Sequence, residues 1–108
     1  EETRHMVNDQ ALRSILEGAI IVNASRGEVV DEQALYNALA SRKVAAAGLD
    51  VFEQEPLPEA STLRTLPNVF MTTHIGAYTY ESISDASRQA AQAVCLFLED
   101  EEIPSRLV

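Results

Sequence analysis

Four ionisable side chains follow three short apolar runs in this sequence: Arg26, Asp50, Glu55 and His74. If the apolar runs are parallel strands of one sheet, the loops that follow them meet at the same edge, where open α/β sheets bind their ligands. Any one of these residues alone is most simply a polar loop residue. The convergence of all four on one edge favours a functional site.

The types of these side chains indicate a particular chemistry. A guanidinium offers two parallel donors to a carboxylate, so Arg26 is expected to anchor a carboxylate group. An imidazole exchanges protons near neutral pH, so His74 would donate a proton to a carbonyl oxygen or take one from a hydroxyl. A carboxylate bonded to the other ring nitrogen fixes the histidine tautomer, and Glu55 is expected in that role. Such acid–base assistance is worth about 10²–10⁴ in rate.

Helices and strands are expected to alternate around these loops. Asn8 and Asp31 are suited to cap two helices, and Gly18 to a left-handed helix stop. The expected strands are 19–23, 44 to about 50 and 69–73, and the expected helices are 9–17, 32–43 and about 79–100, with a short helical turn from Ser61. This alternation is typical of an α/β fold in which crossover helices join parallel strands.

The apolar patterns indicate which faces are buried. The run "AIIVN" at 19–23 is continuous and rich in β-branched residues, which favours a strand covered on both faces. Two of the expected helices carry apolar residues at spacings of three and four, which predicts one buried stripe on each. The stripes are Ala34, Leu35, Ala38 and Leu39 in the first helix, and Ile83, Ala86, Ala90, Val94 and Phe97 in the second.

Composition narrows the classes of partner and location. The 108 residues suit one small domain, and 17 acidic against 8 basic residues give a net charge of -9, which argues against nucleic acid and anionic membranes as partners. No apolar run reaches the length of about 20 residues that a membrane span needs. The single Cys95 fits a reducing compartment, so we expect a cytoplasmic location. Two histidines and one cysteine, far apart, give no metal-ligand spacing.

Three stretches, "NASRGEVVDEQAL" (23–35), "AAGLDVFEQEP" (47–56) and "LPNVFMTTHIGAYTYES" (66–82), resemble consecutive motifs of the D-isomer-specific 2-hydroxyacid dehydrogenases, the family that includes D-3-phosphoglycerate dehydrogenase and glyoxylate/hydroxypyruvate reductase. The resemblance implies that Arg26 binds the substrate carboxylate, that Glu55 and His74 form the acid–base pair, and that NAD is the cofactor, with NADP as the alternative. It also implies cofactor contacts from Ala24, Ser25, Arg26, Asp50, His74, Ile75, Gly76 and Ala77. Relatives often carry glycine at the position of Ala77.

The glycine-rich pyrophosphate turn of such domains is absent, because the four glycines of this sequence are far apart. Residues 1–108 are therefore expected to form the C-terminal part of a nucleotide-binding domain, the second half of a doubly wound Rossmann-type sheet. Residues 101–108 would be a tail or a return toward a substrate domain. A fragment of this kind is expected to be inactive alone, to expose the apolar run 19–23 and to self-associate, whereas the whole enzyme is expected to be a homodimer.

Two other functions fit parts of the pattern. Corepressors that sense dinucleotides use the same fold and the same three residues, and a partner-peptide groove in a substrate domain would distinguish them. A purely structural domain would have to explain three motifs in register by coincidence. The leading hypothesis is hydride transfer between a nicotinamide cofactor and a 2-hydroxy or 2-keto acid.

Overall fold

The computed structural model describes residues 2–99, 101 and 102. It divides into two compact units, Glu1–Gly76 and Ala77–Val108. The first unit holds the three strands and two α-helices, and the second holds one long helix. Within the expected tail, residues 101 and 102 have no regular structure and 103–108 lie outside the described residues.

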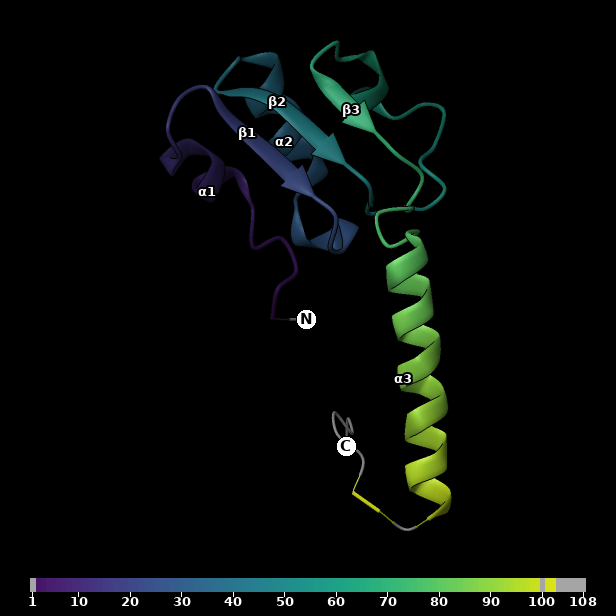
Figure 1. Cartoon of the computed structure of the whole chain (residues 1–108). Coiled ribbons are helices and arrows are strands. Elements are labelled where there is room, and N and C mark those ends of the chain that lie inside the picture. Colours follow the sequence, from purple (N-terminus) through teal and green to yellow (C-terminus); the bar gives the residue numbers. More distant parts are fainter. Residues whose placement is uncertain (1, 100, 103–108) are drawn as a thin grey trace. The chain divides into compact units, whose positions relative to one another are not determined.

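The first unit is built on a three-stranded parallel sheet in the order β1 (Ala19–Asn23), β2 (Val44–Leu49) and β3 (Val69–Met71) (Figure 1). The expected strand positions are confirmed, except that β3 ends two residues early at Met71. Thr72 nevertheless donates its N–H to the carbonyl of Leu49 at 2.9 Å, so the chain still follows β2 as it leaves the strand. All three strands run in the same direction, and their carboxyl ends therefore share one edge.

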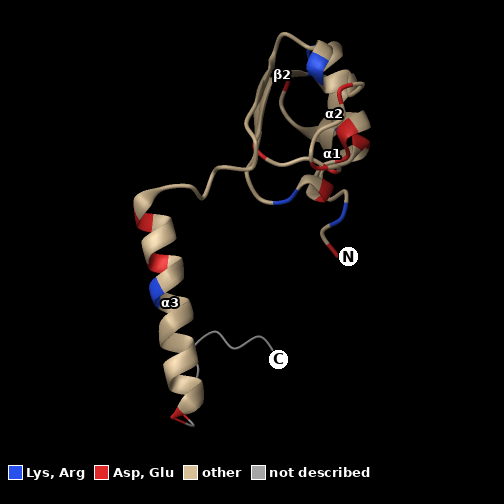
Figure 2. Ribbon diagram, turned by 90° about the vertical axis from the view of Figure 1, so that its right-hand side faces the viewer, with Lys and Arg blue, Asp and Glu red and all other residues tan. Residues whose placement is uncertain are grey.

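Two helices, α1 (Asp9–Ser14) and α2 (Glu32–Ala40), cover the same side of this sheet (Figure 2). Asn8 and Asp31 cap them as expected, each accepting a backbone N–H from the first turn. The predicted stripe on α2 is buried, and it forms the core together with Leu12, Val30, Val44, Ala47, Leu49, Phe52 and Leu63. The core thus holds the strands in place on the helix-covered side.

Both helices end earlier than expected. α1 was expected to reach Glu17 but ends at Ser14, whose hydroxyl donates to the Ala11 carbonyl at 2.7 Å, and the next residue is extended. Gly18 does adopt the left-handed conformation, at φ 79°, but in the turn into β1 rather than at the helix stop. α2 was expected to reach Lys43 but ends at Ala40. Arg42 turns left-handed at φ 63°, and Lys43 instead donates to the carbonyl of Ile15 at 2.6 Å.

No helix of this unit packs on the opposite side of the sheet. β1 forms one sheet edge, and the exposed fractions of Ile20, Val22 and Phe70 are 68%, 75% and 74%. Within this unit, residues 19–23 are covered on one face only and not on both as expected, because no helix of the unit packs on the other side. The expected apolar edge and uncovered face are confirmed.

The second unit consists mainly of α3 (Tyr80–Leu98), which Thr79 caps by accepting the N–H of Ser82 at 3.1 Å. Its expected start is confirmed to within one residue, and the expected last residue, Asp100, lies outside the described part of the chain. Within this unit the apolar stripe of α3 is exposed, because no other helix or strand among the described residues belongs to the unit. No helix among the described residues has the length and apolar character needed to cross a membrane.

Candidate active site

His74 and Glu55 form a hydrogen-bonded pair on the loops that follow β3 and β2. Nδ1 of His74 lies 2.7 Å from Oε2 of Glu55, and the N–H of Phe52 donates to Oε1 of the same carboxylate at 3.0 Å. The bond from His74, followed by that from Phe52, lowers the pKa of Glu55, so the carboxylate is the stable form. The predicted pairing is present, while the catalytic role of the pair stays a prediction.

Asp50 holds the backbone that presents His74. Its two carboxylate oxygens accept the Thr72 hydroxyl, the N–H of Ile75 at 2.9 Å and the N–H of Gly76 at 2.8 Å. These hydrogen bonds, with that from Thr72 the largest, lower the pKa of the Asp50 carboxyl. His74 itself has φ 59°, a left-handed conformation that is uncommon outside glycine. Three donors on a buried carboxylate thus keep the histidine in an otherwise unfavoured backbone shape.

Asp50 and Gly76 were both expected to contact the cofactor, and in the structure they contact each other. Only 8% of Asp50 is exposed, and both of its oxygens bind the chain itself. A Cβ at Gly76 would lie 2.9 Å from Oδ2 of Asp50 and 3.9 Å from Cβ of Ala24, so these three residues are neighbours. Contact of Asp50 with a nicotinamide carboxamide stays a prediction, whereas its hold on the His74 loop is structural.

The loop after β1 is organised by Asn23, which the sequence analysis did not single out. The Asn23 side chain accepts from the N–H and the hydroxyl of Ser25 at 3.1 and 2.8 Å, and donates to the carbonyl of Arg26 at 2.9 Å. Asn23 is 5% exposed. Its position as the last, polar residue of an apolar run was the available signal, since a buried amide needs nearby partners.

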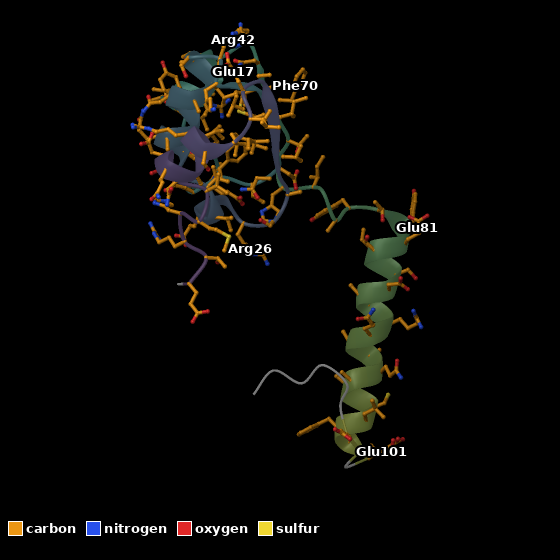
Figure 3. All side chains as sticks on the ribbon, turned by 90° about the vertical axis from the view of Figure 1, so that its left-hand side faces the viewer. Glu17, Arg26, Arg42, Phe70, Glu81 and Glu101 are labelled. Carbon is orange, nitrogen blue, oxygen red and sulfur yellow. The ribbon has the colours of Figure 1, made fainter. Side chains whose placement is uncertain are left out.

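Arg26 lies at the predicted edge but apart from the Glu55–His74 cavity. Figure 3 shows it at the end of the unit opposite Glu17 and Arg42, which precede β1 and β2. Its guanidinium donates to the carbonyl of Ser25 at 2.6 Å and lines a small hollow of about 200 Å³ beside Arg4 and Glu28. The structure therefore does not bring Arg26 to the histidine pair, and its substrate-anchoring role stays a prediction.

The pair borders a larger cavity of about 520 Å³. Apolar side chains and one cation line it with the pair: Phe52, Pro56, Leu57, Arg64 and Met71. Arg64 was missed from the sequence, because it lies on the 3-10 turn η2 (Thr62–Thr65), with no local pattern that points to the cavity. Its guanidinium donates to the carbonyls of Pro58 and Leu57 at 3.0 and 2.9 Å, which fastens the loop that follows Glu55.

The residues at this edge fit one end of a dinucleotide. Ala24 and Gly76 are small, close neighbours, and Ile75 is 49% exposed beside them, which leaves backbone and an apolar side chain open to a flat ring. The glycine-rich turn that would hold a pyrophosphate is not part of this sequence. Ala77 belongs to the second unit, where its carbonyl accepts the N–H of Thr79 at 2.9 Å.

A parallel sheet with helices packed on it and a cavity at the carboxyl ends of its strands is the arrangement of an open, Rossmann-type α/β domain. Comparison with protein families identifies the family to which the chain belongs. Residues 1–76 match the model of the family described as D-isomer specific 2-hydroxyacid dehydrogenase, NAD binding domain. The chain belongs to this family, which confirms the resemblance seen in its motifs.

Two curated relatives are reductases of small keto acids by name. The chain is 52% identical over 90 residues to glyoxylate/hydroxypyruvate reductase B of Enterobacter agglomerans, covering 83% of this chain and 28% of that protein. It is 44% identical over 108 residues to glyoxylate reductase of Korarchaeum cryptofilum, covering all of this chain and 32% of that protein. The chain therefore spans about a third of the length of these relatives.

Solved structures of related dehydrogenases share the fold. A D-isomer specific 2-hydroxyacid dehydrogenase of Xanthobacter autotrophicus, in complex with NADPH and MES, superimposes with a TM-score of 0.88 at 36% identity, covering 99% of this chain and 43% of that one. D-lactate dehydrogenase of Lactobacillus jensenii with NAD⁺ gives a TM-score of 0.81 at 25% identity, covering 99% and 36%. One of these two neighbours is thus found with NADPH and the other with NAD⁺, and the predicted α/β class is confirmed.

Proposed function

We propose that the chain is the C-terminal half of the NAD-binding domain of a longer oxidoreductase. The enzyme would transfer a hydride between a nicotinamide cofactor and a 2-hydroxy or 2-keto acid. The observation that carries this proposal is the 2.7 Å contact between Nδ1 of His74 and Oε2 of Glu55 at the carboxyl edge of the sheet. Family membership supports it, and the names of the relatives favour glyoxylate or hydroxypyruvate as the substrate.

In this mechanism the protein residues handle the proton and the substrate. A bound nicotinamide cofactor would supply or accept the hydride. Because Nδ1 of His74 is engaged by Glu55, Nε2 is the ring nitrogen that would give a proton to the substrate carbonyl oxygen during reduction. The ionised Glu55 would stabilise the imidazolium and hold the ring in one tautomer. Asp50 would keep the histidine loop in place through its three hydrogen bonds.

Arg26 would bind the substrate carboxylate in the complete enzyme. Its side chain is exposed and its contact within the unit is to a neighbouring carbonyl, so the guanidinium retains donors for an anion. Ala24, Ser25, Ile75, Gly76 and Ala77 would line the cofactor. NAD is the proposed cofactor, with NADP as the alternative, and the complete enzyme is proposed to be a cytoplasmic homodimer.

The proposal is tested by kinetics on the complete enzyme with NADH or NADPH and with glyoxylate, hydroxypyruvate and 3-phosphohydroxypyruvate. We expect His74→Ala to lower kcat by about 10²–10⁴. Arg26→Ala should also raise KM, because it removes a contact to the substrate carboxylate. Arg42→Ala serves as the control, since this arginine lies at the opposite end of the unit (Figure 3).

Two results would contradict the proposal. The first is tight dinucleotide binding without reduction of any 2-keto acid in a broad panel, which would point to a dinucleotide-sensing protein of the corepressor type. The second is a His74→Ala variant as active as the wild type, which would remove the proton-transfer role from the Glu55–His74 pair.

A further inference from the structure

The structure holds a second Glu–His contact, between His5 and Glu53, which is two residues before Glu55 in the chain. Nε2 of His5 is 3.3 Å from Oε2 of Glu53, and this nitrogen is buried without a hydrogen bond of good geometry among the described residues. His5 also has φ 50°, a left-handed conformation that a non-glycine residue adopts only when its surroundings impose it. A strained backbone and a buried polar atom together indicate that the position of this side chain matters to the fold.

Glu53 is already joined to helix α2 by a reciprocal pair of hydrogen bonds. Its Oε1 accepts the N–H of Glu32 at 2.9 Å, and Oε1 of Glu32 accepts the N–H of Glu53 at 2.8 Å. This brings two carboxylates together, and burial, followed by the charge of Glu53, raises the pKa of Glu32. Oε2 of Glu53 lies 3.3 Å from Nε2 of His5, so the imidazole is in contact with the carboxylate that is joined to α2.

The segment that carries His5 also contacts the loop of Arg26. The N–H of His5 donates to the carbonyl of Glu28 at 2.7 Å, and Val7 forms a parallel bridge with Val30. Arg4 is paired with Glu28 at 2.8 Å. His5 therefore connects the loop after β1 with the loop after β2.

The backbone of the turn at 52–55 is closely packed and hydrogen-bonded on both sides of Glu53. A Cβ added to Gly27 would lie 1.9 Å from the carbonyl carbon of Phe52, so the two backbones are in direct contact. The N–H groups of Phe52 and Glu53 are bonded to Glu55 and Glu32 respectively. A displacement of Glu53 would disturb this turn, and with it the carboxylate that orients His74.

We propose that His5 is a positioning residue for the Glu55–His74 pair, acting through Glu53. This rests on the proposed function for its catalytic meaning, but its structural content is independent of activity. The side chain of His5 clamps Glu53 against the N-terminus of α2 and so keeps Glu55 oriented toward Nδ1 of His74.

The test is ring-nitrogen NMR on the 108-residue chain, at pH values where imidazoles are neutral. His5 and His74 are the two histidines of the chain, so removing one assigns the other. In the wild type, His74 should carry its proton on Nδ1, which donates to Glu55. In His5→Leu this tautomer preference should be lost, while His5→Gln, which keeps a side-chain N–H donor, should retain it.

Two further variants serve as a control and as a replacement for a His5→Leu variant that does not fold. Arg4→Gln alters an exposed ion pair in the same segment and should leave the His74 signals unchanged; an equal change in this control would overturn the proposal. If His5→Leu does not fold, Glu53→Gln replaces it and should cause the same loss of preference. Unchanged His74 signals in the folded His5→Leu variant or in Glu53→Gln would also overturn the proposal. Because the experiment uses no substrate, such a result would leave the proposed dehydrogenase function untouched.

Discussion

Oε2 of Glu55 lies 2.7 Å from Nδ1 of His74, although 19 residues separate them in the chain. The contact joins the loop after β2 to the loop after β3, so it depends on the parallel pairing of these strands. It leaves Nε2 as the ring nitrogen of His74 that Glu55 does not engage.

Glu55→Gln in the complete enzyme should lower kcat by about 10²-fold or more, because a neutral amide cannot stabilise the imidazolium as a carboxylate does. Dinucleotide affinity should be unchanged. Steady-state kinetics and fluorescence titration with NADH measure the two effects separately. Glu59→Gln, an exposed carboxylate on the same loop, is the control, and an equal loss of kcat in that variant would contradict the assignment.

The lowered pKa values of Asp50 and Glu55 predict how stability depends on acid. A carboxyl group whose pKa is lower in the folded than in the unfolded state stabilises the fold. This contribution is fully present above the unfolded pKa of about 4, and it is lost as the pH falls through the folded pKa. Urea unfolding midpoints from neutral pH to pH 3 should therefore fall more steeply for the wild type than for Asp50→Asn. Parallel curves for the two proteins would count against the prediction.

Gly76→Ala should destabilise the first unit by about 1–3 kcal/mol, the usual cost of overpacking. The added Cβ would lie 2.9 Å from Oδ2 of Asp50, the oxygen that accepts the Gly76 N–H. Gly48→Ala is the matched control, because its Cβ would meet nothing nearer than a Val22 methyl at 3.8 Å. Equal unfolding midpoints for the two variants would show that the Asp50 loop tolerates the methyl group.

Glu32→Gln should stabilise the chain by about 0.5 kcal/mol near neutral pH, a typical size for a charge change near the surface. The pKa of Glu32 is raised by burial and by the charge of Glu53, so its ionised form is disfavoured in the fold. This penalty is present above the folded pKa and absent below the unfolded pKa, where both states are protonated. The gain should therefore vanish near pH 3, and a gain that persists there would indicate another cause.

Val22→Thr and Phe70→Thr should reduce self-association of this chain in sedimentation velocity experiments. Both side chains lie on the sheet face that no helix of the unit covers, with 75% and 74% of each exposed. Exposed apolar patches of this kind promote association. Leu16→Thr is the control, since Leu16 is 85% exposed but precedes the sheet. A wild-type chain that sediments as a monomer would contradict the prediction.

Local patterns in the sequence determined the secondary structure to within a few residues. The caps at Asn8 and Asp31 and the apolar stripe of α2 are local signals, because each depends on residues within one or two helical turns. Helix ends were less predictable. After the end of α2, Arg42 adopts a left-handed backbone conformation. Lys43 donates to the carbonyl of Ile15, a partner 28 residues away in the chain that no local pattern predicts.

The sequence by itself therefore determined the alternation of elements, the family and the residue types gathered at one sheet edge. The residue types also predicted the pairing of Glu55 with His74. Tertiary structure alone decided the other contacts: it gave Asp50 three donors from the histidine loop and left Arg26 beside a separate hollow. It also brought Arg64 to the cavity and His5 to Glu53. The physical reason is that hydrogen bonds act over about 3 Å, whereas sequence patterns report only the periodicity of burial along single elements.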